Sequence, residues 1–296
     1  MLEIPQITVS AVASGNPETP GLIAAPTNAF TDWRQMIDEV ELDAVIIATP
    51  PSKHVEMTVG ALKKGLAVML EKPMTTNNEE AELIREAVNS ARRPFMVGHT
   101  HLHSAAFQKL KLCAETAGHI REIIGIGGSW GPFRPDCRGL WDYGPHDISM
   151  TISLIEQIPT TVSAKVQATG PKPLSEIIEI DLEFNDARAN LTVGNAMSKK
   201  RRYFAAKAGA FEFEYDDLAV EKLVHIDSEE GRMPVSIEPE LPLFREIIAF
   251  RDLVVTDNVG TADLDMGIAV TRVLEATELS LERGETKITI DNRHAN

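Results

Sequence analysis

Cysteine, positive charge and long apolar runs are scarce in this sequence, and each scarcity excludes a class of protein. Its two cysteines, Cys113 and Cys137, are too few for the disulfide framework of a small secreted domain. No apolar stretch approaches the roughly 20 residues that a membrane-spanning helix needs. Basic residues number 29 against 44 acidic ones, so the clustered positive surface of a nucleic-acid-binding protein is not expected. We therefore expect neither a membrane nor a nucleic acid as a partner.

The N-terminus also lacks a recognisable targeting signal. Its first residues, MLEIPQITVS, contain no basic segment followed by an apolar one, which is the pattern of a secretory signal. We expect a cytoplasmic protein. With 43% hydrophobic and 25% charged residues the composition is ordinary for a globular protein, and 296 residues suffice for one large domain or two ordinary ones.

The first hundred residues alternate between short apolar runs and helical patterns. The runs that predict strands lie at 6–13, 43–48, 66–70 and 94–100. The patterns that predict helices lie at 31–40, 52–64 and 76–91. Gly65 suits a left-handed helix cap, Thr76-x-x-Glu79 matches a capping box, and the apolar run 43–48 suits a strand buried on both faces. This alternation predicts a parallel α/β sheet over residues 1–103.

The pattern changes after about residue 104. Strands are predicted at 120–129, 160–169, 177–184, 188–197 and 203–215, and helices at about 104–117, 241–255 and 263–282. The segment IIEIDLEF alternates apolar and polar residues, which is typical of an antiparallel sheet with one solvated face. Residues 104–296 are therefore predicted to form a second, α+β domain.

Candidate chemistry lies where the parallel strands end, because ligands of open α/β sheets bind beyond the carboxyl ends of the strands. The segments there are Ala48–Pro51, Glu71-Lys72-Pro73 and His99-Thr100-His101. A lysine is rarely buried unless it is paired, so Lys72 is either a solvated charge or a functional one.

A second candidate lies in the run WDYGPHDISM. Asp142 and His146 are four residues apart, and Pro145 suits the first turn of a helix, on which the two side chains would share a face. A carboxylate beside an imidazole raises its basicity, and an ordinary pKa near 6.5 suits proton transfer. A helix cap with a structural histidine is the alternative interpretation.

Taken together, these segments resemble a known family. The resemblance rests on the run DAVIIATPPSKHVEMTVGALKKGLAVMLEKPMTTNNEEAELI, on WDYGPHD, and on the later segments PLFREIIAF and ATELSLERGE. The sequence closely resembles the Gfo/Idh/MocA family of nicotinamide-dependent sugar and polyol oxidoreductases. The resemblance implies an α/β fold, with a shortened Rossmann-like parallel-sheet domain followed by an α+β domain with a large, mostly antiparallel sheet.

The resemblance also implies an activity. We expect an NAD(P)-dependent oxidoreductase that acts on a secondary alcohol of a sugar, polyol or related hydroxylated compound. Carried across position by position, Lys72 would be the active-site lysine that stabilises alkoxide charge. His146 would accept the proton, and Asp142 would orient the imidazole and favour its cationic form.

The cofactor residues come from the same resemblance. It places five residues along the nicotinamide half of NAD or NADP, namely Thr49, Pro50, His54, Glu71 and Lys72. Ser14 lies where the family reads the adenosine ribose. It lacks the carboxylate that would repel a 2′-phosphate, which tilts the expectation towards NADP, although no arginine follows it.

One element of the family is expected to be missing. No G-x-G-x-x-G turn occurs, and the first predicted strand matches the second strand of the family. The first strand–helix unit would then be absent, through a late start or a genuinely shortened protein, and dinucleotide binding would be poor. The flanking strands would have to close the gap or leave two ladders unpaired. The alternative function is a non-catalytic or cofactor-deficient binding protein of this family.

Histidines and arginines complete the candidates. His99, His101 and His103 alternate, so in a strand they would share one face; a substrate pocket, packing and a zinc site are the three interpretations. We predict His99, His101 and Arg138 as substrate-binding residues and no metal site. Arg134 could line the same polar site.

Two further expectations concern the second domain. The only basic run, Lys199–Arg202, is predicted to be a solvated hairpin, with an anion-binding role as the alternative. The family resemblance implies a homodimer or homotetramer that pairs through the antiparallel sheet, over residues 160–215.

Overall fold

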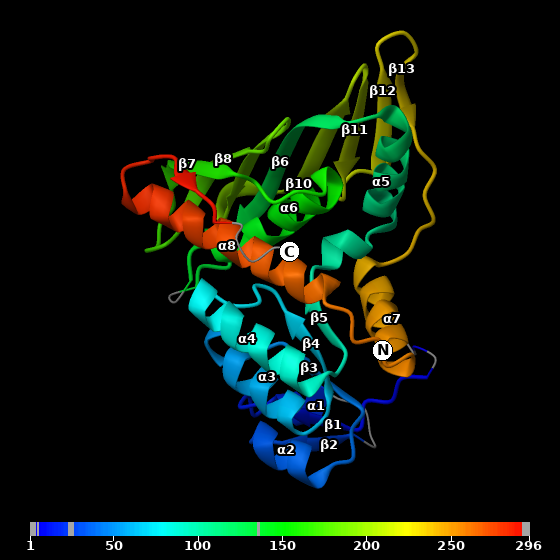
Figure 1. Cartoon of the computed structure of the whole chain (residues 1–296), viewed down its shortest axis with the longest axis vertical. Coiled ribbons are helices and arrows are strands. Elements are labelled where there is room, and N and C mark those ends of the chain that lie inside the picture. The colour runs from blue at the N-terminus through cyan, green and yellow to red at the C-terminus, as the bar shows by residue number, and fades with distance from the viewer. Residues whose placement is uncertain (1–3, 5, 23–26, 135–136, 292–296) are drawn as a thin grey trace.

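The computed structural model describes residues 4, 6–22, 27–134 and 137–291. The N-terminal half consists of short parallel strands and their helices, and the C-terminal half of one large sheet with helices on one face (Figure 1). This arrangement confirms the predicted fold class, a parallel α/β sheet followed by a large, mostly antiparallel sheet.

The N-terminal half alternates strands and helices along the chain. Its strands are β1 (Ala11–Ala13), β2 (Asn28–Phe30), β3 (Ala44–Ile47), β4 (Ala67–Glu71) and β5 (Phe95–Gly98). Its helices are α1 (Thr19–Leu22), α2 (Trp33–Glu39), α3 (His54–Lys63) and α4 (Asn78–Ala91), with a 3-10 turn η1 (Pro51–Lys53) before α3. The predicted strand 6–13 is thus shorter than expected, and β2 and α1 were not predicted.

The parallel strands of this half form two separate ladders. One ladder has the order β3-β4-β5, and the other joins β1 to β2. The central strand β4 is buried along Ala67–Leu70. In contrast, Ile46 of β3 is 53% exposed, so the prediction that this strand is buried on both faces is wrong. Since β3 pairs only with β4 among the described strands, it is an edge strand.

One of the two predicted helix caps is correct, and the other is displaced by one residue. Gly65 follows α3 with a φ of +79°, as expected for a left-handed cap. The helix α4, however, begins one residue later than the predicted capping box. Its N-cap is Asn77, whose side chain accepts a hydrogen bond from the backbone N–H of Glu80 at 2.8 Å.

The C-terminal half is built on a nine-stranded sheet of order β13-β12-β11-β10-β6-β9-β8-β7-β14. Its strands are β6 (Ile120–Trp130), β7 (Thr161–Thr169), β8 (Glu176–Glu183), β9 (Arg188–Gly194), β10 (Ala196–Ala208), β11 (Phe211–Asp216), β12 (Leu223–Asp227), β13 (Gly231–Pro234) and β14 (Ile288–Thr289). Every neighbouring pair is antiparallel except β6 and β9. The predicted strand 203–215 is in fact parts of β10 and β11, which turn at Gly209 with a φ of +60°.

The basic run Lys199–Arg202 lies inside β10, so the predicted hairpin loop is wrong. The strand extends through these charges because Arg201 and Arg202 pair with Gly128 and Gly127 of β6. The ladder therefore fixes Arg201 and Arg202. Lys199 and Lys200 lie in the register shift before Arg201 and are exposed, so these two side chains are solvated as predicted.

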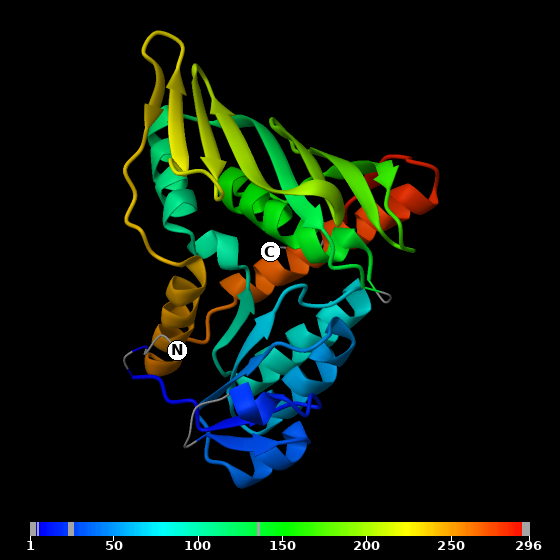
Figure 2. The same ribbon diagram turned by 180° about the vertical axis from the view of Figure 1, so that it is seen from behind.

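Helices cover one face of this sheet, as the two opposite views show (Figures 1 and 2). They are α5 (Ala105–Ala117), α6 (Gly139–Ile155) and α8 (Ala262–Glu282). Phe107 of α5 meets Phe204 of β10 with ring centroids 6.2 Å apart, inside the core. Pro145 lies well inside α6 and not in its first turn, because the helix already begins at Gly139.

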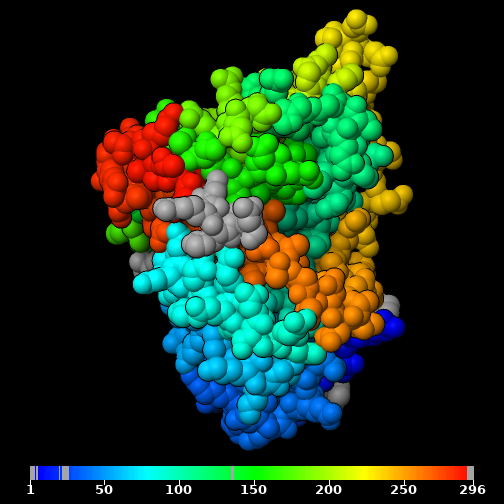
Figure 3. All heavy atoms as spheres, viewed as in Figure 1, coloured from blue at the N-terminus to red at the C-terminus, as the bar shows by residue number. Residues whose placement is uncertain are grey.

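The C-terminal helices join the two halves. The helix α8 contacts β5 and α4 of the first half and β7 and α6 of the second. A Cβ on Gly267 of α8 would lie 2.9 Å from atoms of Met74 and Val97, so this helix packs closely on the parallel sheet. In the space-filling view the orange and red C-terminal atoms extend across the boundary between the halves (Figure 3). None of the described helices is long and apolar enough to cross a membrane.

Candidate active site

Lys72 extends from the end of β4 to the second half of the molecule. Its Nζ donates to the backbone O of Asp142 at 2.8 Å and to the carboxylate Oδ1 of the same residue at 3.0 Å. The two side chains are 16% and 18% exposed. Of the two interpretations open from the sequence, the solvated one is excluded, since this ammonium is held in an ion pair between the halves.

His54 fixes the loop that carries Lys72. The side chain is fully buried, with Nδ1 3.0 Å from Pro73 O and Nε2 2.9 Å from Thr49 O. Nδ1 is also 3.2 Å from Met74 O. Because both nitrogens lie near main-chain carbonyls, the predicted cofactor contact of His54 is not supported by its contacts. Its imidazole instead connects the ends of β3 and β4.

His146 lies one helical turn beyond Asp142 on α6. It is 9% exposed, and its Nδ1 has no hydrogen-bond partner in the described part of the chain. Its ring meets that of His101 edge to face, with centroids 4.7 Å apart. The motif thus brings a largely buried imidazole next to the Lys72–Asp142 pair.

The predicted partnership between Asp142 and His146 is wrong. The carboxylate of Asp142 faces Lys72 and, at 3.5 Å, Arg134. Burial lowers the pKa of His146 well below 6.5, and the neighbouring His101, Lys72 and Arg202 lower that pKa further. The imidazole is therefore held neutral, and Asp142 positions the lysine.

The three alternating histidines do not share a strand face. The strand β5 ends at Gly98, and Thr100–His103 form a 3-10 turn, η2, which breaks the alternation. His99 is buried, and neither of its ring nitrogens has a partner among the described residues. Burial, with Lys72 and His103, lowers its pKa to about 3. Burial, followed by Arg202, lowers the pKa of His101 to about 4.

His101 and His99 both border the site even so. Nδ1 of His101 lies 3.4 Å from the hydroxyl of Tyr215 in β11, and its ring contacts His146. The charge of Lys72 acts on the pKa of both histidines. The structure thus brings these two predicted substrate residues together with the predicted catalytic ones.

Arg138 is engaged elsewhere. Its Nη1 lies 3.3 Å from a carboxylate oxygen of Glu176, and its Nε lies 3.5 Å from one of Glu278. With two carboxylates on its guanidinium, it ties the start of α6 to β8 and α8. The prediction that Arg138 binds substrate is therefore not supported by its contacts.

The strand ends match one half of a dinucleotide. Thr49 and Pro50 follow β3, Glu71 ends β4 and Lys72 follows it; these neighbouring parallel strands end at one edge. Buried His99 follows β5, and its ring nitrogens have no hydrogen-bond partner in the part of the chain that the structure describes. These residues fit the nicotinamide end of the cofactor.

Fewer residues of this chain match the adenosine half of a dinucleotide. Ser14 follows β1, and its hydroxyl accepts hydrogen bonds from Asn16 N at 3.1 Å and from Thr19 Oγ1 at 2.9 Å. No G-x-G-x-x-G turn occurs in the sequence to hold a pyrophosphate. In the part of the chain that the structure describes, no group of three or more His, Cys, Asp or Glu residues could hold a metal ion.

Two residues of the site were not predicted, and a third, Arg202, was considered only as part of the basic run. Tyr143 lies within the D-x-x-x-H segment, and its hydroxyl donates to Gly131 O at 2.7 Å. Tyr215 faces His101, and Arg202 lies over the ring of Tyr143 at 5.1 Å. Side chains alternate along β10 and β11, and this alternation places Arg202 and Tyr215 on one face of the sheet. The sequence alone does not tell which face the helices cover.

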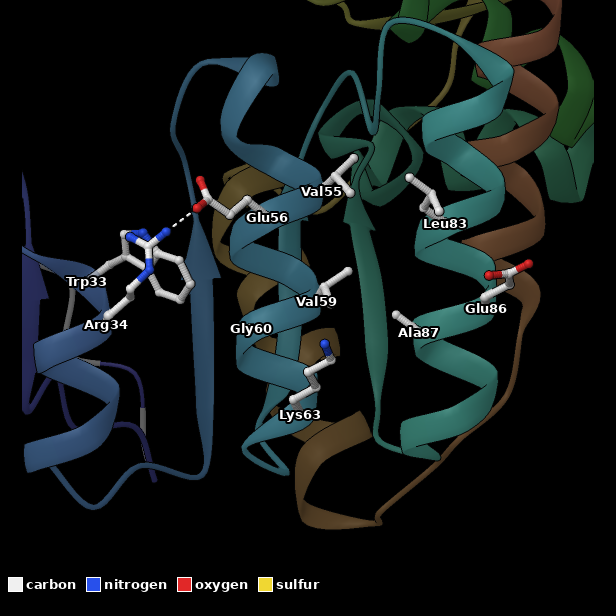
Figure 4. Close-up of a pocket in the computed structure, with 10 residues that line it drawn as sticks. All are labelled: Trp33, Arg34, Val55, Glu56, Val59, Gly60, Lys63, Leu83, Glu86 and Ala87. Carbon is white, nitrogen blue, oxygen red and sulfur yellow. Dashed lines mark hydrogen bonds and ion pairs between the residues drawn. The ribbon is translucent and has the colours of Figure 1, made fainter.

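A separate surface groove of about 690 Å³ lies among α2, α3 and α4 (Figure 4). It contains none of the predicted site residues. Arg34 and Glu56 pair with each other across it, and the remaining lining is largely apolar. We therefore place the site where Lys72, Asp142 and His146 meet, because these residues can carry out the chemistry and the groove offers only volume.

Comparison with known proteins agrees with this geometry. Residues 6–99 match the model of the Gfo/Idh/MocA oxidoreductase family, which has an NAD-binding Rossmann fold. The crystal structure of a provisionally assigned oxidoreductase from Magnetospirillum magnetotacticum MS-1 is 33% identical, with a TM-score of 0.85 over 93% of this chain and 92% of that one. The chain belongs to the Gfo/Idh/MocA family.

Curated members of this family match over shorter stretches. Levoglucosan dehydrogenase of Pseudarthrobacter phenanthrenivorans is 30% identical over 122 residues, which is 40% of this chain and 31% of that protein. The NADP-dependent scyllo-inositol 2-dehydrogenase of Bacillus subtilis is 28% identical over 150 residues, 46% of this chain and 41% of that protein. The chain therefore aligns with less than half the length of these relatives.

Proposed function

We propose that the protein is an NAD(P)-dependent oxidoreductase that interconverts a secondary alcohol and a ketone in a sugar, polyol or related hydroxylated compound. The observation that carries this proposal is the contact of Lys72 in one half with Asp142 in the other, one helical turn from a buried imidazole with a free nitrogen. Family membership supports it, and so do the dehydrogenase names of the curated relatives.

In the oxidation direction a hydride leaves carbon while the hydroxyl loses its proton. The nicotinamide, when bound beside Thr49, Pro50 and Glu71, supplies the hydride acceptor. The ammonium of Lys72 stabilises negative charge that develops on the substrate oxygen. Neutral His146, with its unpaired Nδ1, accepts the proton. Asp142 holds the ammonium in place, and in reduction the roles reverse.

Between the two dinucleotides, the structure offers one argument. Ser14, at the end of β1, presents a hydroxyl where a carboxylate would hydrogen-bond the ribose of NAD and repel the phosphate of NADP. This supports NADP as the cofactor.

A second candidate function is a family member that binds a hydroxylated ligand without redox chemistry. The observation that favours it is the division of the described parallel strands into two separate ladders, β1-β2 and β3-β4-β5. The two candidates differ in whether a dinucleotide binds and is reduced.

The test is the formation of reduced nicotinamide from levoglucosan, myo-inositol, scyllo-inositol and D-gluconate with NAD and with NADP. We expect turnover of at least one compound. Lys72→Met should lower kcat/KM by about 100-fold or more, as for loss of an electrostatic stabiliser. His146→Asn should lower it by about 100-fold or more, as for loss of a general base.

Lys64→Met is the matched control, because Lys64 pairs with Asp38 on the surface, with side chains 52% and 54% exposed. It should leave turnover unchanged. Activity retained in both site variants would refute the assigned roles. Calorimetric binding of a polyol, without binding or reduction of either dinucleotide, would establish the second candidate instead.

A further inference from the structure

Arg202 points to the side of the sheet that carries the site. Side chains alternate along a strand, so Arg202 shares a face with Phe204, which packs on Phe107 of α5. Its partner in β6 is Gly127, where a Cβ would overlap the carboxylate of Asp147 in α6. Two independent contacts thus place the guanidinium on the face covered by α5 and α6.

The guanidinium is positioned by an aromatic ring of the site. Its Cζ lies 5.1 Å from the ring centroid of Tyr143, within the range of a cation–π contact. That ring is fixed, because its hydroxyl donates to Gly131 O at 2.7 Å. Tyr143 belongs to α6, the helix that carries Asp142 and His146, and the charge of Arg202 acts on the pKa of His146.

No carboxylate of the described residues pairs with this cation. Within the described residues Arg202 forms no ion pair, and its one hydrogen bond runs from Nη1 to its neighbour's carbonyl, Arg201 O, at 3.4 Å. The nearby carboxylate of Asp217 is paired with Lys222 at 2.7 Å. Burial raises the pKa of Asp147 to about 7 in spite of Arg202, so this acid is a poor counterion at neutral pH.

The site as a whole has a surplus of positive charge. Lys72 and Arg134 share the single carboxylate of Asp142, at 3.0 and 3.5 Å. Among the described residues, Lys72, Arg134 and Arg202 are three cations beside one paired carboxylate, in a protein whose net charge is −15. Arg202 and Lys200 lower the pKa of His101, and Asp217, which is paired with Lys222, raises it, so these charges reach the site. This local excess is the signature of a site that receives an anion.

We propose that Arg202 is a specificity-determining residue that binds a negatively charged group of the substrate, so that the substrate is a hydroxylated compound carrying a carboxylate or a phosphate. The inference names the substrate class of the site and, as far as it concerns catalysis, rests on the proposed function. Arginine suits this role, since its planar fork donates two parallel hydrogen bonds to either group.

The charge of such a substrate also has a consequence for proton transfer. The neighbouring cations disfavour the protonated form of His146. An anionic group on Arg202 offsets part of that effect and makes the imidazole a better proton acceptor. A neutral polyol lacks this contribution.

The test is calorimetric binding of D-gluconate, D-glucose 6-phosphate and D-glucose to the full chain. We expect at least one of the two anions to bind about tenfold or more tightly than D-glucose, in line with charge-assisted hydrogen bonding. Arg202→Gln should lower the affinity for that anion by about tenfold or more, and Arg202→Lys should restore part of it.

Arg201→Gln is the matched control. Arg201 is the preceding residue on β10, exposed and directed to the opposite face of the sheet. It should leave binding within about twofold of the wild type, as expected of an exposed charge outside the site. Preference for gluconate would identify a carboxylate as the anionic group, and preference for the sugar phosphate a phosphate.

Two results would overturn the inference. One is that neither anion binds more tightly than D-glucose, and the other is that the two arginine variants lose affinity equally. The proposed function is tested separately, by nicotinamide reduction. Turnover of neutral polyols alone, with no anion binding, would refute this inference and leave the proposed function standing. Anion binding without redox turnover would support this inference and refute the proposed function.

Discussion

His146 is kept neutral by its surroundings, and this sets the pH dependence of the site. Its pKa lies well below 6.5, first because the ring is buried and then because His101, Lys72 and Arg202 oppose a further positive charge. A group that must be neutral to accept a proton stays competent as the pH falls, until the pH reaches its own pKa. The acid limb of activity should therefore lie lower than that of an exposed histidine.

The prediction is an acid limb of kcat/KM below pH 6.5, measured for alcohol oxidation. Arg202→Gln removes a cation that disfavours the imidazolium form, so it should raise the pKa of His146 and move the limb to higher pH. The Arg201→Gln control should leave the limb in place. A limb at or above pH 6.5 in the wild type, or one that does not respond to Arg202→Gln, would contradict this account of the imidazole.

Single residues were predicted from the sequence only as far as their chemistry is local. Lys72 and His146 were identified from strand ends, spacing and resemblance. The pairing of Lys72 with Asp142 spans 70 residues and needed the fold. His54 and Arg138 were assigned to ligands because a sequence does not show the carbonyls and carboxylates that occupy them here.

At the scale of elements, the glycines of β6 decide how closely α6 approaches the sheet. A Cβ on Gly125 would lie 2.8 Å from Asp147 Oδ1, and one on Gly127 would overlap the same carboxylate. The helix that carries Asp142 and His146 therefore packs closely on the backbone of β6, where the two glycines leave room for the Asp147 carboxylate. This close packing sets the distance between the sheet and the helix that carries Asp142 and His146.

Gly127→Ala should lower the free energy of unfolding by about 1–3 kcal/mol, because overpacking shifts well-packed neighbours. Gly15→Ala is the control, since nothing lies within 4 Å of a Cβ there. Urea unfolding measures both. In an Asp147→Ala background the cost of the added methyl should largely disappear; an equal cost in both backgrounds would show that the carboxylate is not what the methyl meets.

Elements were predicted well where periodicity is strong and less well where chain direction changes. The helices α7 (Pro242–Val255) and α8 agree closely with their predicted ranges. The turn η2 was missed because three alternating histidines imitate a strand. The turn at Gly209 was missed because aromatic and apolar residues recur on both sides of it, from Tyr203 to Tyr215. In each case the sequence pattern of a strand continues past the residue at which the chain turns, and tertiary packing decides where that turn occurs.

At the scale of the molecule, the site exists because two halves meet. The loop after β4 supplies Lys72, the helix α6 supplies Asp142 and His146, and α8 packs against both halves. The sequence predicted the two kinds of sheet, because their periodicities differ. It did not predict how they face one another. Assembly as a homodimer or homotetramer through the large sheet stays a prediction.

The measurement that tests the central claim most directly is a double-mutant cycle across the two halves, with Lys72→Met and Asp142→Asn, read out as kcat/KM. If the ammonium and the carboxylate act as one unit, each single variant should lose activity and the double variant should lose little more than the worse single one. The coupling energy should then be at least about 1 kcal/mol. Losses that simply add would show that Lys72 and Asp142 act independently, and the shared site proposed here would be wrong.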